Sequence, residues 1–248
     1  MPYSEQAVLS VRPWSDRTFS FTLSRPRDFA FASGEFVTLG LKREGRLIAR
    51  AYSIVSPADA PELEFLSIHV PDGPLTSQLA QVRPGDGVWL NSKPTGSLTL
   101  DHVLPGRTLY MLATGTGLAP FMSLVRDPET FARFETVVLV HSVRTAAELA
   151  YREELDARAD ACFRYMPTVT REPFATSERG STLFASGRLF AQLGLPAADP
   201  AHDRVMICGN PDMTREMTQY LKDAGWTLTN HRGIGNFTTE LAFVTQHA

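Results

Sequence analysis

Residues 46–57 of the 248-residue chain, RLIARAYSIVSP, form a β-prone run whose polar side chains could bind a cofactor. Alternation along a strand puts Arg50 and Tyr52 on one face. An arginine there can grip a phosphate through two parallel hydrogen bonds, and a tyrosine can lie flat on an aromatic ring system. Ser53 adds a hydroxyl at the end of the run. These groups suit a ligand with a phosphate and a flat ring, such as a flavin nucleotide. The alternative is an ordinary amphipathic strand with a surface arginine.

Two further segments could bind phosphate through the backbone. In GPLTSQL, residues Leu75 to Ser77 open a short helix, so free N–H groups and the Thr76 hydroxyl could take an anion, although many helix caps look the same. In YMLATGTGLAPF, a buried strand ends at Gly115-Thr116-Gly117 and a helix begins. Glycines at this edge of an open α/β sheet allow a phosphate to approach closely, but the full G-x-G-x-x-G pattern is absent. A tight strand–helix turn is the alternative.

The later strands end in residues that suit a pyridine nucleotide. Cys208 ends a buried run and Gly209 follows it. The sulfur could pack against a nicotinamide ring, and the glycine could let a ligand come close; a small buried hydrophobe is the other interpretation of the cysteine. Arginines after the later strands lie on the same predicted edge as Gly115–Gly117, namely Arg144, Arg171 and Arg179. They suit a phosphorylated dinucleotide, with a 2′-phosphate favouring NADP over NAD, or they are solvated loop charges.

The elements that must position these residues change in type near residue 106. Six short β-prone runs with turn residues between them predict a small antiparallel barrel. The runs are residues 7–14, 18–25, 35–43, 46–56, 63–70 and 86–92, and a short helix is expected at residues 76–81. After residue 106, apolar strand-like runs alternate with helical runs, which predicts a parallel α/β sheet. Its strands are expected within residues 108–117, 136–143, 163–172, 204–210 and 226–232, and its helices within residues 118–127, 146–158, 187–194 and 211–225. Asn210 suits the cap of the last helix, Pro211 its first position and Gly225 its end.

Composition excludes several classes of function. The net charge is −3 and the pI about 6.1, without the basic excess that nucleic-acid binding needs. Two cysteines are too few for an iron–sulfur cluster, and no metal-binding spacing is present, so redox chemistry here would need an organic cofactor. The first ten residues lack the regions of a secretory signal, and no apolar run approaches the ~18 residues of a membrane span. We therefore expect a cytoplasmic protein that binds neither nucleic acid nor membrane.

Four motifs in order, RAYSI, GPLTS, GTGLAPF and CGNPDM, resemble the ferredoxin–NADP reductase family, most closely its bacterial branch, the ferredoxin (flavodoxin)–NADP reductases. SIHVPDGPLTSQL, HSVRTAAELAYREEL and LGLPAADPAHDRVMICGNPDM also resemble that branch, so the similarity covers nearly the whole chain. It implies an all-β antiparallel FAD-binding barrel at residues 1–98, a linker at 99–107, and an α/β parallel-sheet NADP-binding domain at 108–248 whose C-terminal tail reaches the flavin.

The resemblance also implies roles for individual residues. Arg50 would hold the FAD pyrophosphate, Tyr52 would pack on the isoalloxazine and Ser53 would lie near flavin N5. The remaining FAD contacts would be Ala51, Ile68, His69, Val70, Leu75, Thr76, Thr116 and, from the tail, Ala242 and Phe243. The loop Gly115-Thr116-Gly117 would bind NADP, with Arg171 and Arg179 on the 2′-phosphate, Arg144 toward the pyrophosphate, Cys208 and Gly209 beside the nicotinamide, and Asp212 toward the adenosine. Glu240 matches an acidic residue before the tail. Ser53, Cys208, Glu240 and Ala242 are the candidate catalytic residues, and no metal is implied.

The implied reaction is FAD-dependent electron transfer between NADPH and a one-electron carrier protein, ferredoxin or flavodoxin. A hydride passes to flavin N5 and the electrons leave one at a time. The family analogy favours a monomer. A free-flavin reductase or an oxygenase reductase component is the second hypothesis, and the pair Arg50 and Thr76 argues for retained FAD instead. A non-catalytic NADP(H) sensor is the third, although the chain carries nothing that looks like an output domain.

Overall fold

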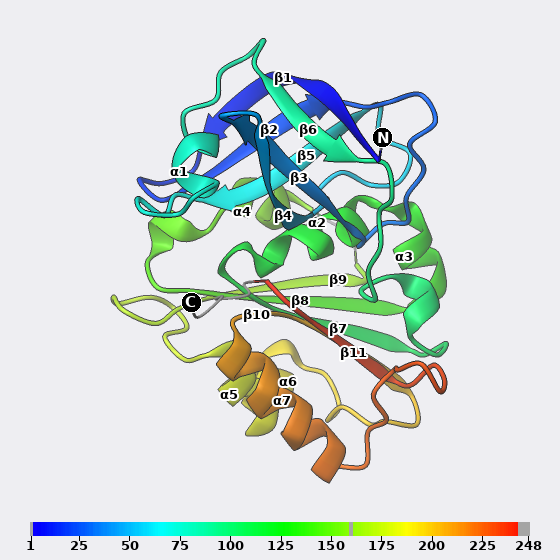
Figure 1. The fold of residues 1–248 in the computed structure, drawn as a ribbon. Coiled ribbons are helices and arrows are strands. Elements are labelled where there is room, and N and C mark those ends of the chain that lie inside the picture. Colours follow the sequence, from blue (N-terminus) through cyan, green and yellow to red (C-terminus); the bar gives the residue numbers. More distant parts are fainter. Residues whose placement is uncertain (1, 159–160, 243–248) are drawn as a thin grey trace.

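The computed structural model describes residues 2–158 and 161–242 and divides into a β-rich part and an α/β part (Figure 1). The first part is a six-stranded antiparallel sheet in the order β4-β3-β6-β1-β2-β5. Its strands are β1 (Tyr3–Pro13), β2 (Thr18–Ser24), β3 (Phe36–Arg43), β4 (Arg46–Ser53), β5 (Glu62–Ile68) and β6 (Gly87–Asn91). A short helix, α1 (Thr76–Leu79), interrupts it between β5 and β6. These elements match the predicted barrel.

The sheet curls into a barrel around its own apolar core. Alternate side chains from its strands, among them Val8, Phe21, Leu39 and Leu63, are buried together. Ile54, the residue after the edge strand β4, forms an isolated bridge with Phe65 in the middle of the other edge strand, β5. Within the part of the chain that the structure describes, β4 otherwise pairs with β3 alone, so its other edge is free of strand pairing there.

The second part is a five-stranded parallel sheet in the order β11-β10-β7-β8-β9. Its strands are β7 (Thr108–Thr114), β8 (Thr136–Val143), β9 (Phe163–Val169), β10 (Asp203–Gly209) and β11 (Phe237–Leu241). Strands β7, β8 and β10 are almost wholly buried because helices cover both faces. The predicted parallel α/β architecture is therefore confirmed.

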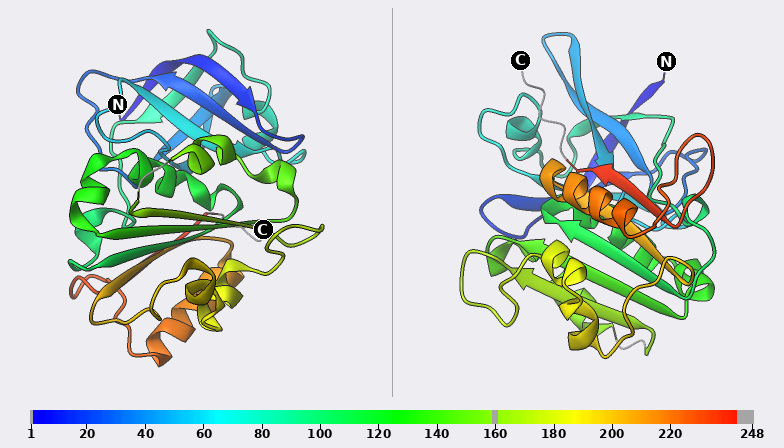
Figure 2. Two further views of the ribbon diagram at one scale, coloured as in Figure 1. Left: turned by 180° about the vertical axis from the view of Figure 1, so that it is seen from behind. Right: turned by 90° about the horizontal axis from the view of Figure 1, so that it is seen from below.

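The helices form two layers (Figures 1 and 2). Between the barrel and the sheet lie α2 (Ala119–Arg126), α3 (Pro128–Arg133) and α4 (Arg152–Ala157). On the far face lie α5 (Gly180–Ala185), α6 (Arg188–Leu193) and α7 (Pro211–Asp223). The described residues also form the 3₁₀ turns η1 (Leu100–His102), η2 (Gly115–Leu118) and η3 (Ala146–Glu148). Among the described residues, no helix has both the length and the apolar character that crossing a membrane requires.

Two sequence predictions for the α/β part are wrong. Residues 226–232 do not form the fifth strand; Leu228 makes only an isolated bridge with Phe237, and the chain turns at residues 230–233 before β11 pairs with β10. The helix expected over residues 146–158 is broken, because Tyr151 adopts a left-handed backbone at φ +59°. The centroid of the Tyr151 ring lies 4.4 Å from that of Trp14, and the Tyr151 hydroxyl donates to Glu64 of the barrel. These contacts with the barrel stabilise the left-handed conformation that interrupts the helix.

Helix α2 joins the two parts firmly. Arg126 at its end pairs with Glu64 of β5 at 2.7 Å and with Glu154 of α4 at 2.7 Å. The buried Ser123 hydroxyl donates to the Ser56 carbonyl at 2.7 Å, and it accepts from the backbone of Gly34 at 3.2 Å. Apolar side chains of both parts also share one buried cluster. Because η2 leads directly into α2, these contacts fix the Gly115 loop relative to the barrel.

Candidate active site

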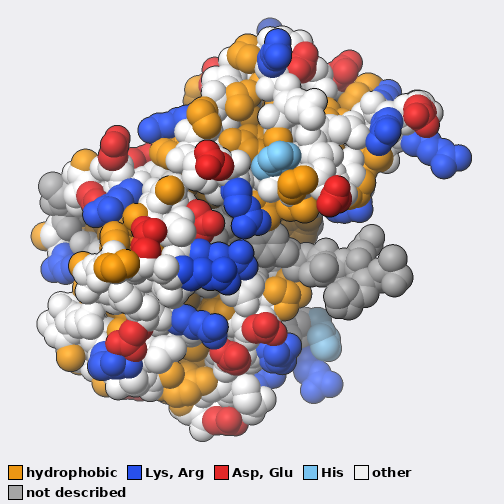
Figure 3. Space-filling view, turned by 90° about the vertical axis from the view of Figure 1, so that its left-hand side faces the viewer, with side chains coloured by type: hydrophobic (Ala, Val, Ile, Leu, Met, Phe, Trp, Pro, Cys, Tyr) orange, Lys and Arg blue, Asp and Glu red, His pale blue; other side chains and the backbone are white. Residues whose placement is uncertain are grey.

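A cavity of about 1050 Å³ lies between the barrel and the carboxyl edge of the parallel sheet. Its barrel wall is formed by Arg17, Thr18, Leu66 and Ile68. Its opposite wall comes from the ends of β7, β8 and β9 and the start of α7, and includes Thr114–Thr116, Arg144, Thr170, Arg171, Arg179 and Asn210–Met213. Figure 3 shows Lys and Arg side chains gathered around this hollow. A positively charged cleft at the carboxyl edge of an α/β sheet suits a phosphorylated ligand.

Strand β4 is exposed in a way that suits a bound flat cofactor. None of its residues is buried, although most strands of this fold carry buried positions. Arg50 lies opposite Leu39 and Tyr52 opposite Val37, so both side chains lie on one face of β4. Tyr52 packs edge-on against Phe21 and accepts from the Ser67 hydroxyl at 3.5 Å, while burial raises the pKa of Tyr52. The exposed Arg50 donates only to the carbonyl of its neighbour Ala49 among the described residues.

The segment after β5 supplies a tight turn beside this strand. Its tightness is set by Gly73, since a Cβ there would lie 2.1 Å from the Thr76 hydroxyl oxygen. That hydroxyl donates to the carbonyl of Val70 at 3.3 Å. The Val70 side chain itself is 38% exposed, and Leu241 at the end of β11 is 50% exposed. An unpaired strand edge, an exposed arginine and exposed apolar side chains suit a flavin nucleotide, because its ring needs an apolar cover and its diphosphate needs a cation.

The loop Gly115–Leu118 presents backbone to the cavity. Gly115 has φ +53°, and a Cβ added there would meet nothing within 4 Å. Gly117 differs, because its Cβ would lie 2.3 Å from the carbonyl oxygen of Cys208. Gly209 also packs against protein, with the Thr114 hydroxyl 2.1 Å from its Cβ position. The left-handed backbone therefore accounts for the glycine at position 115, close packing on β10 accounts for Gly117, and contact with Thr114 of β7 accounts for Gly209.

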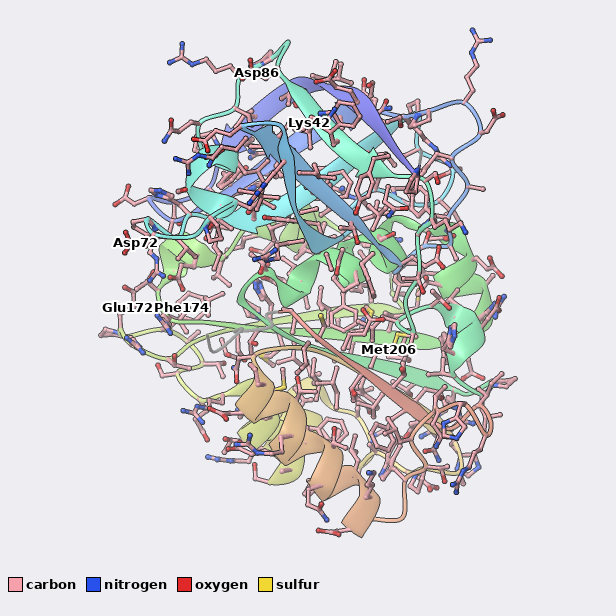
Figure 4. The ribbon with its side chains drawn as sticks, viewed as in Figure 1. Lys42, Asp72, Asp86, Glu172, Phe174 and Met206 are labelled. Atoms are coloured by element: carbon pink, nitrogen blue, oxygen red, sulfur yellow. The ribbon has the colours of Figure 1, made fainter. Side chains whose placement is uncertain are left out.

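The three arginines expected at this edge all line the cavity. The loops that carry them are adjacent, since the backbone N–H of Arg171 donates to the carbonyl of Arg144 at 2.9 Å. Figure 4 shows the loop after β9 projecting beyond the sheet, with Glu172 and Phe174 at its tip. Asn210 caps α7 by accepting from Met213 at 2.9 Å, as predicted, and Asp212 pairs with Arg215 at 2.7 Å. Several cations and a helix N-terminus thus face the same space.

The ends of β10 and β11 bring three candidate residues together. Cys208 lies opposite Glu240 in the parallel register, and Ala242 packs against the apolar cluster that contains Cys208. Cys208 is 1% exposed, and burial, followed by the nearby Glu240, raises the pKa of its thiol. Burial also raises the pKa of Glu240, although hydrogen bonds from Ser97 oppose this. The raised pKa keeps the Cys208 thiol protonated near neutral pH. Phe243 lies outside the described residues.

Sequence reasoning missed several residues around this site. Arg17, in the turn before β2, and Thr18, the first residue of β2, reach the cavity, although the sequence indicates only a turn between two strands there. Ser97 contacts Glu240 only through the fold. His141 lies under the Gly115 loop, and its position in a buried strand was the available signal. No group of three His, Cys, Asp or Glu side chains within residues 2–158 and 161–242 could hold a metal ion.

Comparisons with known proteins agree with both halves of this site. A family model described as the oxidoreductase FAD-binding domain matches residues 8–99, and one described as the oxidoreductase NAD-binding domain matches residues 111–219. The ferredoxin–NADP reductase of Pseudomonas aeruginosa is 46% identical over 98% of this chain and 98% of the relative. The flavodoxin/ferredoxin–NADP reductase of Rhodobacter capsulatus is 43% identical over 96% and 93%.

A solved structure extends the similarity to three dimensions. It is a ferredoxin NADP⁺ reductase from Neisseria gonorrhoeae with bound FAD and NADP, and it superposes with a TM-score of 0.93 at 33% identity. The match covers 98% of this chain and all of that one. Sequence, fold and cavity therefore agree, and the chain belongs to the bacterial ferredoxin/flavodoxin–NADP reductase family.

Proposed function

We propose that this chain is an FAD enzyme that transfers electrons between NADP(H) and a one-electron carrier protein, ferredoxin or flavodoxin. The observation that carries the proposal is the cavity in which the barrel and the carboxyl edge of the parallel sheet face each other. A hydride donor bound to the sheet and an acceptor bound to the barrel can meet there without leaving the protein. The names of the relatives include both carriers.

On the barrel side, the proposed work of the chain is to bind and orient FAD. Arg50 binds the diphosphate, Tyr52 packs on the isoalloxazine and Ser53 lies near N5. The other proposed contacts are Ala51, Ile68, His69, Val70, Leu75, Thr76, Thr116, Ala242 and Phe243. When bound, FAD accepts a hydride from NADPH and gives up the two electrons singly. The free edge of β4 supports this placement.

On the sheet side, the proposed work is to hold NADP(H) by its phosphates. Gly115 and Thr116 face the cavity and contact the dinucleotide backbone, and Gly117 shapes that loop. Arg171 and Arg179 bind the 2′-phosphate, and Arg144 lies toward the pyrophosphate. Guanidinium groups suit this role because they bind phosphate oxygens in pairs. Asp212, at the start of α7, lies toward the adenosine.

The nicotinamide end is assigned to Cys208, Gly209, Glu240 and Ala242. The Cys208 thiol stays protonated, because burial raises its pKa, and therefore acts by packing rather than as a nucleophile. Glu240, whose pKa is also raised, holds a proton more readily than an exposed carboxyl group does. Ala242 places a small side chain beside the cluster that contains Cys208.

We divide the chain into an FAD-binding barrel at residues 1–98, a linker at 99–107 and an NADP-binding domain at 108–248. The strand bounds support this, since β6 ends at Asn91 and β7 begins at Thr108. We further propose that the enzyme works in the cytoplasm as a monomer. Light scattering of the FAD-loaded protein at micromolar concentration tests the monomer directly.

The experiment for the function as a whole is anaerobic reduction of a purified ferredoxin and a purified flavodoxin with NADPH as the electron donor. The FAD-loaded enzyme, desalted beforehand, should reduce at least one of them, and FAD should remain with the protein. Loss of FAD on desalting, together with rapid reduction of free flavin and none of either carrier, would instead make the chain a free-flavin reductase.

A further inference from the structure

His141 is a buried titratable side chain for which the proposed mechanism has no use. It lies on β8 between Ala113 of β7 and Pro167 of β9 in the parallel register, and it is 1% exposed. It does not line the cavity, whereas its neighbours Val140 and Ser142 do. Strand alternation therefore puts the imidazole on the face of the sheet opposite to those two residues.

One hydrogen bond connects this ring to the dinucleotide loop. The imidazole Nε2 lies 3.0 Å from the carbonyl oxygen of Gly115. A carbonyl oxygen only accepts, so Nε2 carries the hydrogen and the neutral ring leaves Nδ1 unprotonated. Nδ1 is buried and has no hydrogen-bond partner among the described residues. Burial lowers the pKa of His141 to about 4, so the ring stays neutral near pH 7.

The buried histidine is unfavourable as simple packing. An acceptor buried without a partner is destabilising, and an apolar side chain of similar size would avoid that cost. Among the described residues, the polar contact of His141 is with Gly115, whose φ of +53° is costly for other residue types. The contact therefore falls on the most unusual backbone position of the loop.

Fixing the Gly115 carbonyl also fixes the next N–H. A peptide unit is planar and trans, so the N–H of Thr116 points away from the carbonyl oxygen of Gly115. His141 holds that oxygen from the buried side, which directs the Thr116 N–H toward the opposite side. Thr116 and Gly115 both line the cavity. The far end of the loop is held separately, by the packing of Gly117 on the Cys208 carbonyl.

We propose that His141 is a positioning residue for pyridine-nucleotide binding: its Nε2–H orients the Gly115–Thr116 peptide so that the Thr116 N–H donates to a diphosphate oxygen of the nucleotide. This inference rests on the proposed function. Loss of His141 should affect nucleotide binding differently from loss of Arg171 and Arg179, which are proposed to bind the 2′-phosphate that only NADP carries. The diphosphate is common to NADP and NAD, so loss of His141 weakens both nucleotides by the same factor.

The test compares His141→Gln with His141→Asn in the FAD-loaded enzyme. The Gln amide nitrogen reaches the position of Nε2, whereas the Asn nitrogen matches Nδ1 and falls short of Gly115. Dissociation constants for NADP⁺ and NAD⁺ are measured from the flavin difference spectrum, with FAD content and melting temperature as controls. His141→Asn should weaken both nucleotides about tenfold, the effect of one well-placed hydrogen bond, and His141→Gln should stay within about twofold of wild type.

Two results would overturn the inference. One is unchanged nucleotide binding by His141→Asn. The other is equal loss in His141→Gln and His141→Asn at normal FAD content. A ¹⁵N NMR spectrum of the wild type adds a check that does not depend on variant folding, since one histidine should remain the neutral Nε2–H tautomer at pH 5. If the wild type itself failed to bind FAD or NADP⁺, the proposed function would fail instead.

Discussion

The carboxylate of Glu240 accepts hydrogen bonds from the backbone N–H of Ser97 and, at 3.2 Å, from the Ser97 hydroxyl. The two residues are 143 positions apart in the sequence. A Cβ on the preceding Gly96 would lie 3.1 Å from the Glu240 oxygen, so a glycine leaves the carboxylate room to reach Ser97. The contact ties the last strand of the parallel sheet to the segment that leaves the barrel.

Removal of this carboxylate should weaken the fold. Glu240→Ala deprives the part-buried Ser97 N–H of its acceptor, which should lower the free energy of unfolding by about 1–3 kcal/mol. Glu240→Gln keeps an acceptor oxygen and should recover most of the loss. Denaturant unfolding of the FAD-loaded enzyme measures both. Asp212→Ala removes an exposed carboxylate as a control and should change stability by about 0.5 kcal/mol or less. Equal losses in Glu240→Ala and Asp212→Ala would contradict the role given to Ser97.

Removal of the Arg50 guanidinium should lower FAD occupancy. Arg50→Ala takes away the cation proposed for the diphosphate, so the purified protein should carry less flavin per chain. Arg46→Ala is the matched control, because Arg46 is an exposed arginine at the other end of β4. The ratio of flavin to protein absorbance after desalting reports the outcome. Full yellow colour in Arg50→Ala would remove Arg50 from the site.

The hydroxyl of Tyr151 should matter to stability, whereas that of Tyr165 should not. Tyr151 donates to Glu64 across the interface at 2.8 Å, so Tyr151→Phe should cost about 1–3 kcal/mol. The Tyr165 hydroxyl is buried without a partner among the described residues, so Tyr165→Phe should be neutral or stabilising. Denaturant unfolding compares the pair. If Tyr165→Phe lowered the free energy of unfolding more than Tyr151→Phe, the role given to the hydrogen bond between Tyr151 and Glu64 would be contradicted.

The buried His141 should make stability depend on pH. Its pKa is about 4 in the folded enzyme and about 6.5 in an unfolded chain, so between these values the unfolded state binds more protons. Stability should therefore fall as the pH is lowered from about 6.5 to about 4, by up to about 3 kcal/mol from this group. His141→Gln should show a shallower fall in unfolding experiments across that range. Parallel curves for the two proteins would show that His141 does not titrate in this way.

The elements closest to the site could be read from local sequence because short-range chemistry determines them. The run from Thr108 through Arg126 is an apolar strand, a glycine turn and a helix, as expected. Asn210 and Gly225 end α7 as their residue types predict, with Gly225 at φ +84°. The three cavity arginines follow from the rule that parallel strands share one carboxyl edge.

Other features depend on contacts that no local pattern reveals. Residues 226–232 are as β-prone as residues 237–241, and only pairing with β10 decides that the second run is the strand. The break at Tyr151 lies within a helix-favouring run, because the ring is held by Trp14 and the hydroxyl by Glu64. Arg17 enters the cavity, and Ser97 meets Glu240, only after the two domains have packed together.

An anaerobic titration of the FAD-loaded enzyme with NADPH and with NADH, followed by visible spectroscopy, tests the central claim most directly. The flavin absorbance should bleach at low NADPH and should need far more NADH, because the proposed ligands of the 2′-phosphate are Arg171 and Arg179, which line the cavity. The double variant Arg171→Ala, Arg179→Ala should lose most of that preference while still bleaching. A protein that takes up no FAD, or a flavin that neither nucleotide bleaches, would contradict the account of this chain as an NADP-linked flavoenzyme.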